Sequence, residues 1–554
     1  MKKIIKLITV SVFCVSLCFG LLVKAEVKIA APRIVNIINF IRNVEPRDSV
    51  ITEDVLYQTV VKQVQILKDH QLKGTFLLQY DALINPRYQQ LLTKDVYPGT
   101  EIGGWWEITE PHVKAAGLKW RGRYSWDWHA NVGFATGYTP AEREKLVDVY
   151  MTKFKEIFGK YPTSIGSWFI DAHTLAYMAD KYHVIASCNC KDQVGTDGYT
   201  MWGGYWNQAY YPSKKNAYMP AQTEQGQISV PIFRMLGSDP IYQYDSGLGG
   251  SRQSVVSLEP VYKEGGGSQK WVEWLFKSLF EEPCLAFGYT QVGQENSFTW
   301  NAMEQGFEIQ IPLLDKLQKE KKIQVATLSE VGSWFKMQFP LTPATAVTTL
   351  TDFRSNGKKT VWYNSRYYRA NLLWDESSFR FRDIHLFNEA YQSDYLNKAG
   401  TSTQCIYTTL PFVDGCLWSS VKQLAGLRLK YRDLSGKMVE AKGKVPTVTE
   451  KGNNLIVKWP LINKAVLSIT FMEDRMLVSC PGLANWQLEL TTLQDIKLPF
   501  TSITSHKVEA IQKSFSYQVL CTRGRFVDTR NHDNGSILCI EPINGQLELS
   551  FKQN

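Results

Sequence analysis

The sequence predicts an α/β fold in which a barrel of parallel strands is followed by an antiparallel β-sandwich. Three observations lead to this prediction. From about residue 30 to 340, strand-like and helix-like segments alternate, which is typical of a parallel sheet with helices outside it. No Gly-rich nucleotide fingerprint follows the first strand, which favours a barrel over a dinucleotide-binding sheet. Beyond residue 430, short alternating runs separated by turn residues indicate antiparallel strands.

The elements of the barrel are placed by local signals. The first strand is nearly unbroken in Ile, Val and Phe, and the helix after it begins at Thr52 as N-cap. A capping box with Thr139 and Glu142 opens a helix that ends at Gly159. Two further helices are expected, one ending at Tyr182 and one over 303–321. Strands are expected at 34–41, 74–80, 100–106, 164–170, 184–187, 284–290 and 323–328.

A chain of 554 residues is too long for one hydrophobic core. We therefore expect four segments along it. The Thr-rich stretch 341–352 is expected to be a flexible connection after the barrel. The segments are a signal peptide at 1–25, the barrel at 30–340, a mixed bridging subdomain at 353–430 and the β-sandwich at 431–554.

The N-terminus is typical of a secretory signal peptide. Lys2, Lys3 and Lys6 precede an apolar run, and Val23-Lys24-Ala25 places small residues at the cleavage position. We therefore expect a periplasmic or secreted protein cleaved after Ala25, with no later membrane span. The net charge of +9 includes the lysines of this segment, and no basic cluster indicates a nucleic-acid partner.

Eight cysteines remain after the signal peptide, and export would allow them to form disulfides. Their connectivity cannot be deduced from sequence. Cys188 and Cys190 have the wrong spacing for a zinc knuckle, and nothing near them completes one. The sequence therefore indicates no cofactor.

Polar and aromatic residues gather where the predicted strands end. In β/α barrels the chemistry lies at the C-terminal ends of the strands, so these residues are expected to surround one cleft. The members of this set are Glu45, Arg47, Trp105, Trp106, Glu107, Trp126, Asp127, His129, Asp171, His173, Gln294, Glu295, Asn296 and Trp300.

Carboxylates with tryptophans beside them suit the cleavage of a sugar chain. Hydrolysis of a glycosidic bond needs one carboxyl group to protonate the leaving oxygen and another to attack carbon or activate water. A strand-end Asp or Glu is more often a helix cap or an ion-pair partner, so a single one decides nothing. Asp171 and His173, with His129, are an alternative set of metal ligands.

The motifs over 30–340 resemble the superfamily that joins polysaccharide deacetylases to glycoside hydrolase families 57 and 38, and family 57 most. "NVEPRD" (43–48) is similar to the His-Gln-Pro motif after strand one, and Pro46 keeps the match. "GSWFIDAHT" (166–174) resembles the Trp-x-Pro-Glu segment, which places Asp171 at the nucleophile. "GQENSFTW" (293–300) and "TLSEVGSWF" (327–335) resemble two later segments of these barrels. The resemblance implies a distorted seven-stranded TIM-like barrel.

The sequence departs from these families at several positions. The His of the first family 57 motif is missing, and the family's acid/base Asp falls on Gly293, with Glu295 two residues later. Trp105 and Thr109 stand where deacetylases carry metal-binding histidines, which disfavours a zinc deacetylase. The chain also resembles an exported family of gut anaerobes from which no activity transfers.

The leading hypothesis is an exported glycoside hydrolase with a retaining mechanism, acting on oligosaccharides or polysaccharides. Asp171 is the expected nucleophile and Glu295 the general acid/base. Glu45, Glu107, Asp127 and His129 would hold hydroxyls, and the substrate would also contact Arg47, Gln294 and Asn296. Trp105, Trp106, Trp126 and Trp300 would form the subsite walls. The alternatives are a divalent-metal deacetylase or hydrolase and a non-catalytic carbohydrate-binding protein.

Overall fold

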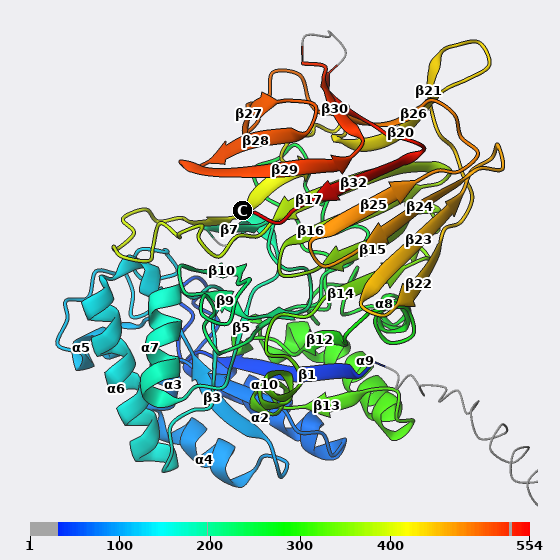
Figure 1. Cartoon of the computed structure of the whole chain (residues 1–554). Coiled ribbons are helices and arrows are strands. Elements are labelled where there is room, and N and C mark those ends of the chain that lie inside the picture. Colours follow the sequence, from blue (N-terminus) through cyan, green and yellow to red (C-terminus); the bar gives the residue numbers. More distant parts are fainter. Residues whose placement is uncertain (1–30, 197, 531–534, 554) are drawn as a thin grey trace, which may run out of the picture. The chain divides into compact units, whose positions relative to one another are not determined.

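The computed structural model describes residues 31–196, 198–530 and 535–553 (Figure 1). The signal peptide expected at 1–25 lies outside the described residues. Within the three described ranges, no helix combines the length and the apolar character that a membrane crossing requires. In the same ranges all eight cysteines are buried and none forms a disulfide, so the disulfides that export would allow are not formed.

A mixed sheet forms a nearly closed barrel, and it holds nine strands within the described residues, where the resemblance implied seven. Its order is β12-β1-β2-β3-β4-β5-β11-β8, and β13 also pairs with β1. All of these pairings are parallel except that of β8 with β11. The strands are β1 (Arg33–Ile41), β2 (Thr75–Leu78), β3 (Glu101–Trp105), β4 (Ser164–Gly166), β5 (Ala186–Asn189), β8 (Ala209–Tyr210), β11 (Ile232–Arg234), β12 (Gly288–Val292) and β13 (Gln324–Ala326).

Strand β1 is central because it has partners on both edges. Its first half pairs with β12 and β13, and its second half pairs with β2. From Ile34 to Ile41 every residue is buried, which explains the nearly continuous apolar run. The strand therefore delivers the charged residues that follow it to the C-terminal end of the barrel.

Helices cover the outside of this sheet (Figure 1). The predicted caps are confirmed: Thr52 caps α2, and Thr139 with Glu142 forms a capping box on α6, which ends at Gly159 in the left-handed conformation. The helices are α2 (Glu53–Asp69), α3 (Tyr80–Leu83), α4 (Pro86–Lys94), α5 (Glu110–Ala115), α6 (Pro140–Phe158), α7 (Ala172–Tyr182), α8 (Gln269–Phe280), α9 (Trp300–Lys319) and α10 (Leu328–Gln338), with 3₁₀ turns η1 (Ala135–Gly137) and η2 (Asn296–Phe298).

Several strands end at other residues than predicted, and these ends decide which residues lie at the barrel mouth. Strand β4 ends at Gly166 and not at residue 170, and β5 runs two residues beyond the predicted end at 187. Strand β12 ends at Val292, and Gly293 follows with φ at +103°. A Cβ at Gly293 would collide with the carbonyl oxygen of Ile38, so no carboxylate residue fits there.

The segment expected to be a flexible connection contains the buried strand β14 (Thr345–Thr349). The expectation was wrong because β14 pairs with β15 and all five of its residues are buried. It begins a sheet of ten strands, counted over the described residues. The others are β15 (Lys359–Asn364), β16 (Tyr368–Asp375), β17 (Ser378–Leu386), β19 (Leu410–Asp414), β20 (Gly426–Arg432), β21 (Met438–Glu440), β26 (Trp486–Thr491), β30 (Arg525–Asp528) and β31 (Ser536–Glu541).

A second antiparallel sheet has eight strands in the part of the chain that is described. Side chains of the two sheets meet in ring contacts such as that of Tyr363 with Phe471, whose centroids are 5.1 Å apart. The mixed α/β class with a barrel and further antiparallel sheets is therefore confirmed. The strands are β22 (Thr447–Lys451), β23 (Asn454–Pro460), β24 (Val466–Phe471), β25 (Arg475–Ser479), β27 (Phe500–Ile503), β28 (Lys507–Gln512), β29 (Phe515–Arg523) and β32 (Gln546–Ser550).

Two small sheets belong to the insertions of the barrel. One pairs β9 (Pro212–Ser213) with β10 (Asn216–Pro220). The other has the order β18-β7-β6, with β6 (Gln193–Thr196), β7 (Tyr199–Trp202) and β18 (Cys405–Thr408). Because β18 comes from beyond the barrel region and pairs in parallel with β7, this sheet ties the two regions together.

Candidate functional site

A cavity of about 480 Å³ opens at the C-terminal ends of the barrel strands. This is a usual volume for a small-molecule site, and it lies at the face where barrel enzymes carry their chemistry. Residues that follow five of the strands line it: Glu45 and Arg47 after β1, Trp168 after β4, Cys190 and Lys191 after β5, Leu236 after β11 and Glu295 after β12.

Arg42 organises the charges behind this cavity. Its guanidinium group donates two hydrogen bonds to Glu107, at 2.7 and 3.0 Å, and its Nη1 atom lies 2.7 Å from Oε2 of Glu295. It also lies over the ring of Trp126, 4.1 Å from the centroid. All four side chains are buried, so each charge depends on its partners for compensation.

Glu295 is a buried carboxyl group of the cavity wall, with 4% of its surface exposed. Burial raises its pKa to about 7. The positive charge of Arg42 opposes this rise, and the negative charge of Glu107 adds to it. Oε1 accepts a hydrogen bond from Ser297 at 2.8 Å, whereas Oε2 accepts none among the described residues. The raised pKa keeps Glu295 protonated up to about neutral pH, with Ser297 beside Oε1 and Arg42 beside Oε2.

Glu45 lines the same cavity in the opposite charge state. Burial would raise its pKa, but hydrogen bonds from Arg47 and the charges of Arg42 and Arg47 outweigh burial and hold the pKa below its ordinary value. Nη1 of Arg42 lies 4.0 Å from Oε2 of Glu45 and 2.7 Å from Oε2 of Glu295. These two oxygens are therefore within about 7 Å of each other, a separation that can flank a glycosidic bond.

A third carboxylate, Glu259, was not among the predicted site residues. It pairs with Lys191 at 3.1 Å and accepts hydrogen bonds from Ser257 and Gln294. Lys191 was missed because the fifth strand was expected to end at 187. No strand was predicted around β11, which left Glu259 without a position in the barrel. The apolar run "VPIFRML" (230–236) is the signal in the sequence that indicates that strand.

Asp171 does not line the cavity that contains Glu295. It caps α7 by accepting hydrogen bonds from the backbone and the hydroxyl of Thr174, and it pairs with Arg143 at 2.8 Å. Both members of this pair are fully buried, and Arg143 also bonds the carbonyls of Tyr395 and Lys398. The structure therefore gives Asp171 a capping and ion-pairing role, and it does not bring Asp171 and Glu295 together in this cavity.

The tryptophans predicted as subsite walls lie mainly in the core. Trp105 stacks on Phe40 with centroids 4.1 Å apart, and Trp106 packs against His112 and Tyr150. Trp126 is covered by Arg42, and Trp300 is half-buried at the start of α9. The aromatic residues that line the cavity are instead Trp168, Tyr199, Tyr262 and Phe298.

Other predicted residues support the cavity wall or lie away from it. Glu107 forms an ion pair with Arg42, and Gln294 donates a hydrogen bond to Glu259. Asn296 accepts a hydrogen bond from the backbone N–H of Arg42. Asp127 pairs with Arg123, and His129 lies next to it.

The alternative metal ligands are not assembled. His173 pairs with Glu144 at 3.0 Å, His129 lies 3.5 Å from Asp127, and Asp171 is held by Arg143. Across residues 31–196, 198–530 and 535–553, no three His, Cys, Asp or Glu side chains are grouped as metal ligands. The proposed set of Asp171, His173 and His129 is therefore not a metal site in this structure.

No protein-family model matches the chain, and no curated protein is similar to it in sequence. A solved structure from Parabacteroides distasonis, provisionally assigned as a glycoside hydrolase/deacetylase, is similar with a TM-score of 0.53 and 15% identity, over 69% of this chain and 90% of that one. This chain therefore has a glycoside hydrolase/deacetylase-like fold, as the motifs had indicated.

Two other solved structures resemble the chain more loosely. One is a provisionally assigned polysaccharide deacetylase from Mycobacterium smegmatis, with a TM-score of 0.33 and 13% identity over 56% of this chain and 92% of that one. The other is the 4-alpha-glucanotransferase of Thermococcus litoralis, with a TM-score of 0.29 and 9% identity over 95% of this chain and 100% of that one. The fold assignment rests on the Parabacteroides structure alone.

Proposed function

We propose that the protein is a carbohydrate-active hydrolase that cleaves glycosidic bonds in the cavity at the barrel mouth. The observation that carries this proposal is the pair of carboxyl groups on its wall. Burial keeps Glu295 protonated up to about pH 7, while Arg47 and Arg42 keep Glu45 ionised. Two neighbouring carboxyl groups with pKa values pushed apart are the arrangement that acid/base catalysis on a glycoside requires.

In the proposed reaction, Glu295 donates its proton to the glycosidic oxygen as the bond to the anomeric carbon breaks. Glu45 attacks that carbon and forms a glycosyl-enzyme intermediate, and Glu295 then deprotonates the water that releases the sugar. The two oxygens are at most about 7 Å apart. A separation of about 5–5.5 Å, as in retaining enzymes, lies within this limit, whereas the range of inverting enzymes begins only at about 6.5 Å. A retaining mechanism is therefore the better fit.

The rest of the cavity suits a sugar ring. Trp168, Tyr199, Tyr262 and Phe298 supply apolar faces, and Glu259 with Lys191 supplies hydrogen-bonding groups for hydroxyls. These residues replace the tryptophans of the sequence-based hypothesis as subsite walls.

The pH dependence of turnover tests this assignment of charges. We expect kcat/KM to fall above about pH 7, as Glu295 loses its proton, and to fall again below the lowered pKa of Glu45. Replacing Arg47 by methionine removes the strongest contact that lowers the pKa of Glu45, so R47M should move the acidic limb to higher pH. The charge of Arg47 also lowers the pKa of Glu295, so the alkaline limb should move to higher pH as well. A profile that stays level through pH 7 would contradict the role of Glu295.

A second candidate is a carbohydrate-binding protein without turnover. It is favoured by the three hydrogen bonds from Arg47 that Glu45 accepts, because they reduce the nucleophilicity of this carboxylate. This candidate predicts saturable glycan binding with no new reducing ends from any glycan.

We also propose that the protein is exported, on the basis of the signal sequence at 1–25. Intact-mass analysis of protein purified from its own cells is expected to give a chain that begins at Glu26. The matched control is the variant Ala25→Arg, which removes the small residue at the cleavage position and should retain the full N-terminus. A chain that keeps Met1 in the unmodified protein would contradict export through this signal.

A further inference from the structure

A second cavity, of about 520 Å³, lies on the other side of the small sheet β18-β7-β6. Tyr199 of β7 lines the first cavity and Trp202 lines the second. Residues three apart on a strand point to opposite faces, so the sheet separates the two cavities. Thr408 is the register partner of Trp202 and lines the second cavity beside it.

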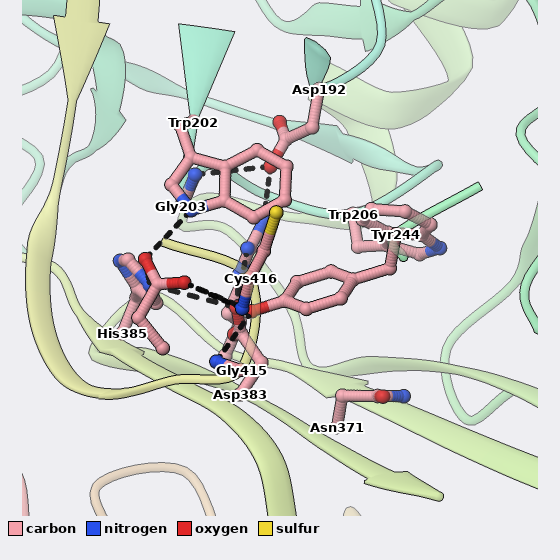
Figure 2. A network of polar contacts seen from close by, with 12 residues as sticks. Asp192, Trp202, Gly203, Trp206, Tyr244, Asn371, Asp383, His385, Gly415 and Cys416 are labelled. Carbon is pink, nitrogen blue, oxygen red and sulfur yellow. Dashed lines mark hydrogen bonds and ion pairs between the residues drawn. The ribbon is translucent and has the colours of Figure 1, made fainter. Parts of the chain in front are cut away.

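The base of this cavity is a buried charge network (Figure 2). His385 is 2% exposed, and its Nε2 atom lies 3.4 Å from a carboxylate oxygen of Asp414 and 3.5 Å from one of Asp383. Asp414 also accepts a hydrogen bond from the Trp202 indole at 2.8 Å. Arg369 joins Asp383 to Asp192, which directly follows Lys191 of the first cavity. The base is thus polar, and ion pairs link its side chains.

The walls and rim combine apolar surface with unused polar groups. Trp418 and Phe500 form an apolar wall, with ring centroids 5.8 Å apart. At the rim, the apolar side chains of Leu417 and Ile511 are 43% and 46% exposed. Thr501, Gln512 and Lys497 also line the cavity, and within the described residues their side chains form no hydrogen bond or ion pair.

We propose that this cavity is a second saccharide-binding site, separate from the barrel mouth. A sugar ring has an apolar face and an edge of hydroxyls, and this cavity offers an aromatic wall beside hydroxyl, amide and ammonium groups that have no protein partner. The bound unit packs against the exposed side chains of Leu417 and Ile511 beside the buried Trp418, and its hydroxyls bond to Thr501, Gln512 and Lys497. The proposal does not depend on catalysis at the barrel mouth.

The test is a titration of the full-length protein with maltose, cellobiose, xylobiose and N,N′-diacetylchitobiose, followed by saturation-transfer NMR. The double variant T501V/Q512L removes the proposed hydrogen-bonding groups with little change in size. We expect it to weaken binding of the preferred disaccharide about tenfold or more. The matched control Q404L changes an exposed glutamine outside the cavity and should bind as the unaltered protein does.

Glu295→Gln separates this proposal from the proposed catalysis, because it alters the barrel mouth and should leave the binding at Trp418 unchanged. Thermal unfolding verifies that each variant is folded. Failure of all four disaccharides to bind would overturn the second site, as would binding that the T501V/Q512L variant retains in full. Absence of turnover in any of these proteins would bear only on the barrel mouth.

Discussion

Glu295→Gln is expected to lower kcat/KM for an oligosaccharide by about a hundredfold to ten-thousandfold, because the amide cannot donate a proton to the leaving oxygen. The fold should persist, since glutamine keeps the hydrogen bond with Ser297 and the buried Arg42 keeps its ion pair with Glu107. The measurement is the initial rate on an oligosaccharide that the unaltered protein cleaves.

The leaving group distinguishes a proton donor from a residue that only shapes the cavity. A dinitrophenyl glycoside of the same sugar departs without protonation, so E295Q should cleave it with a much smaller loss. Glu308→Gln, at an exposed position of α9, is the matched control and should leave both rates unchanged. Equal losses on the two substrates in E295Q would contradict the role of general acid.

Asp171→Asn is expected to reduce the free energy of unfolding by about 3–5 kcal/mol, because it leaves the buried Arg143 without its counter-charge. Asparagine is as good an N-cap as aspartate, so the cap of α7 survives and the loss reports the ion pair. Urea unfolding followed by circular dichroism measures the difference. Turnover per folded molecule should persist.

Asp180→Asn is the control for this change, since Asp180 is exposed on the same helix and should alter stability little. A D171N protein that is as stable as the unaltered one but has lost turnover would return Asp171 to the role of nucleophile. The assignment of that role to Glu45 would then be wrong.

Local signals made much of the barrel predictable from sequence. The run of Ile and Val in β1, the cap at Thr52 and the capping box at Thr139 each act within a few residues, and the structure has them as expected. Glu45, Arg47 and Glu295 were placed in the cavity for the same reason, because each follows a strand and strand ends meet at one face of a barrel.

The roles of the other predicted residues depend on tertiary contacts that the sequence does not contain. Trp105 ends strand β3 and Trp168 lies just after strand β4, yet Trp105 is buried on Phe40 whereas Trp168 lines the cavity. Asp171 was expected to be catalytic from its place in the sequence, but its carboxylate forms an ion pair with Arg143, 28 residues earlier. Glu259 lies in a loop without a strand-end signal, and only the fold brings it to Lys191.

Cleavage of glycosidic bonds at the barrel mouth is the function that we propose for this protein. The most direct measurement is mass spectrometry of a panel of oligosaccharides and their acetylated forms after incubation with the protein in H₂¹⁸O. We expect shorter sugars that carry ¹⁸O at the new reducing end, formed by the unaltered protein and not by E295Q. Release of ¹⁸O-acetate with sugar chains of unchanged length, or no product from any member of the panel, would contradict it.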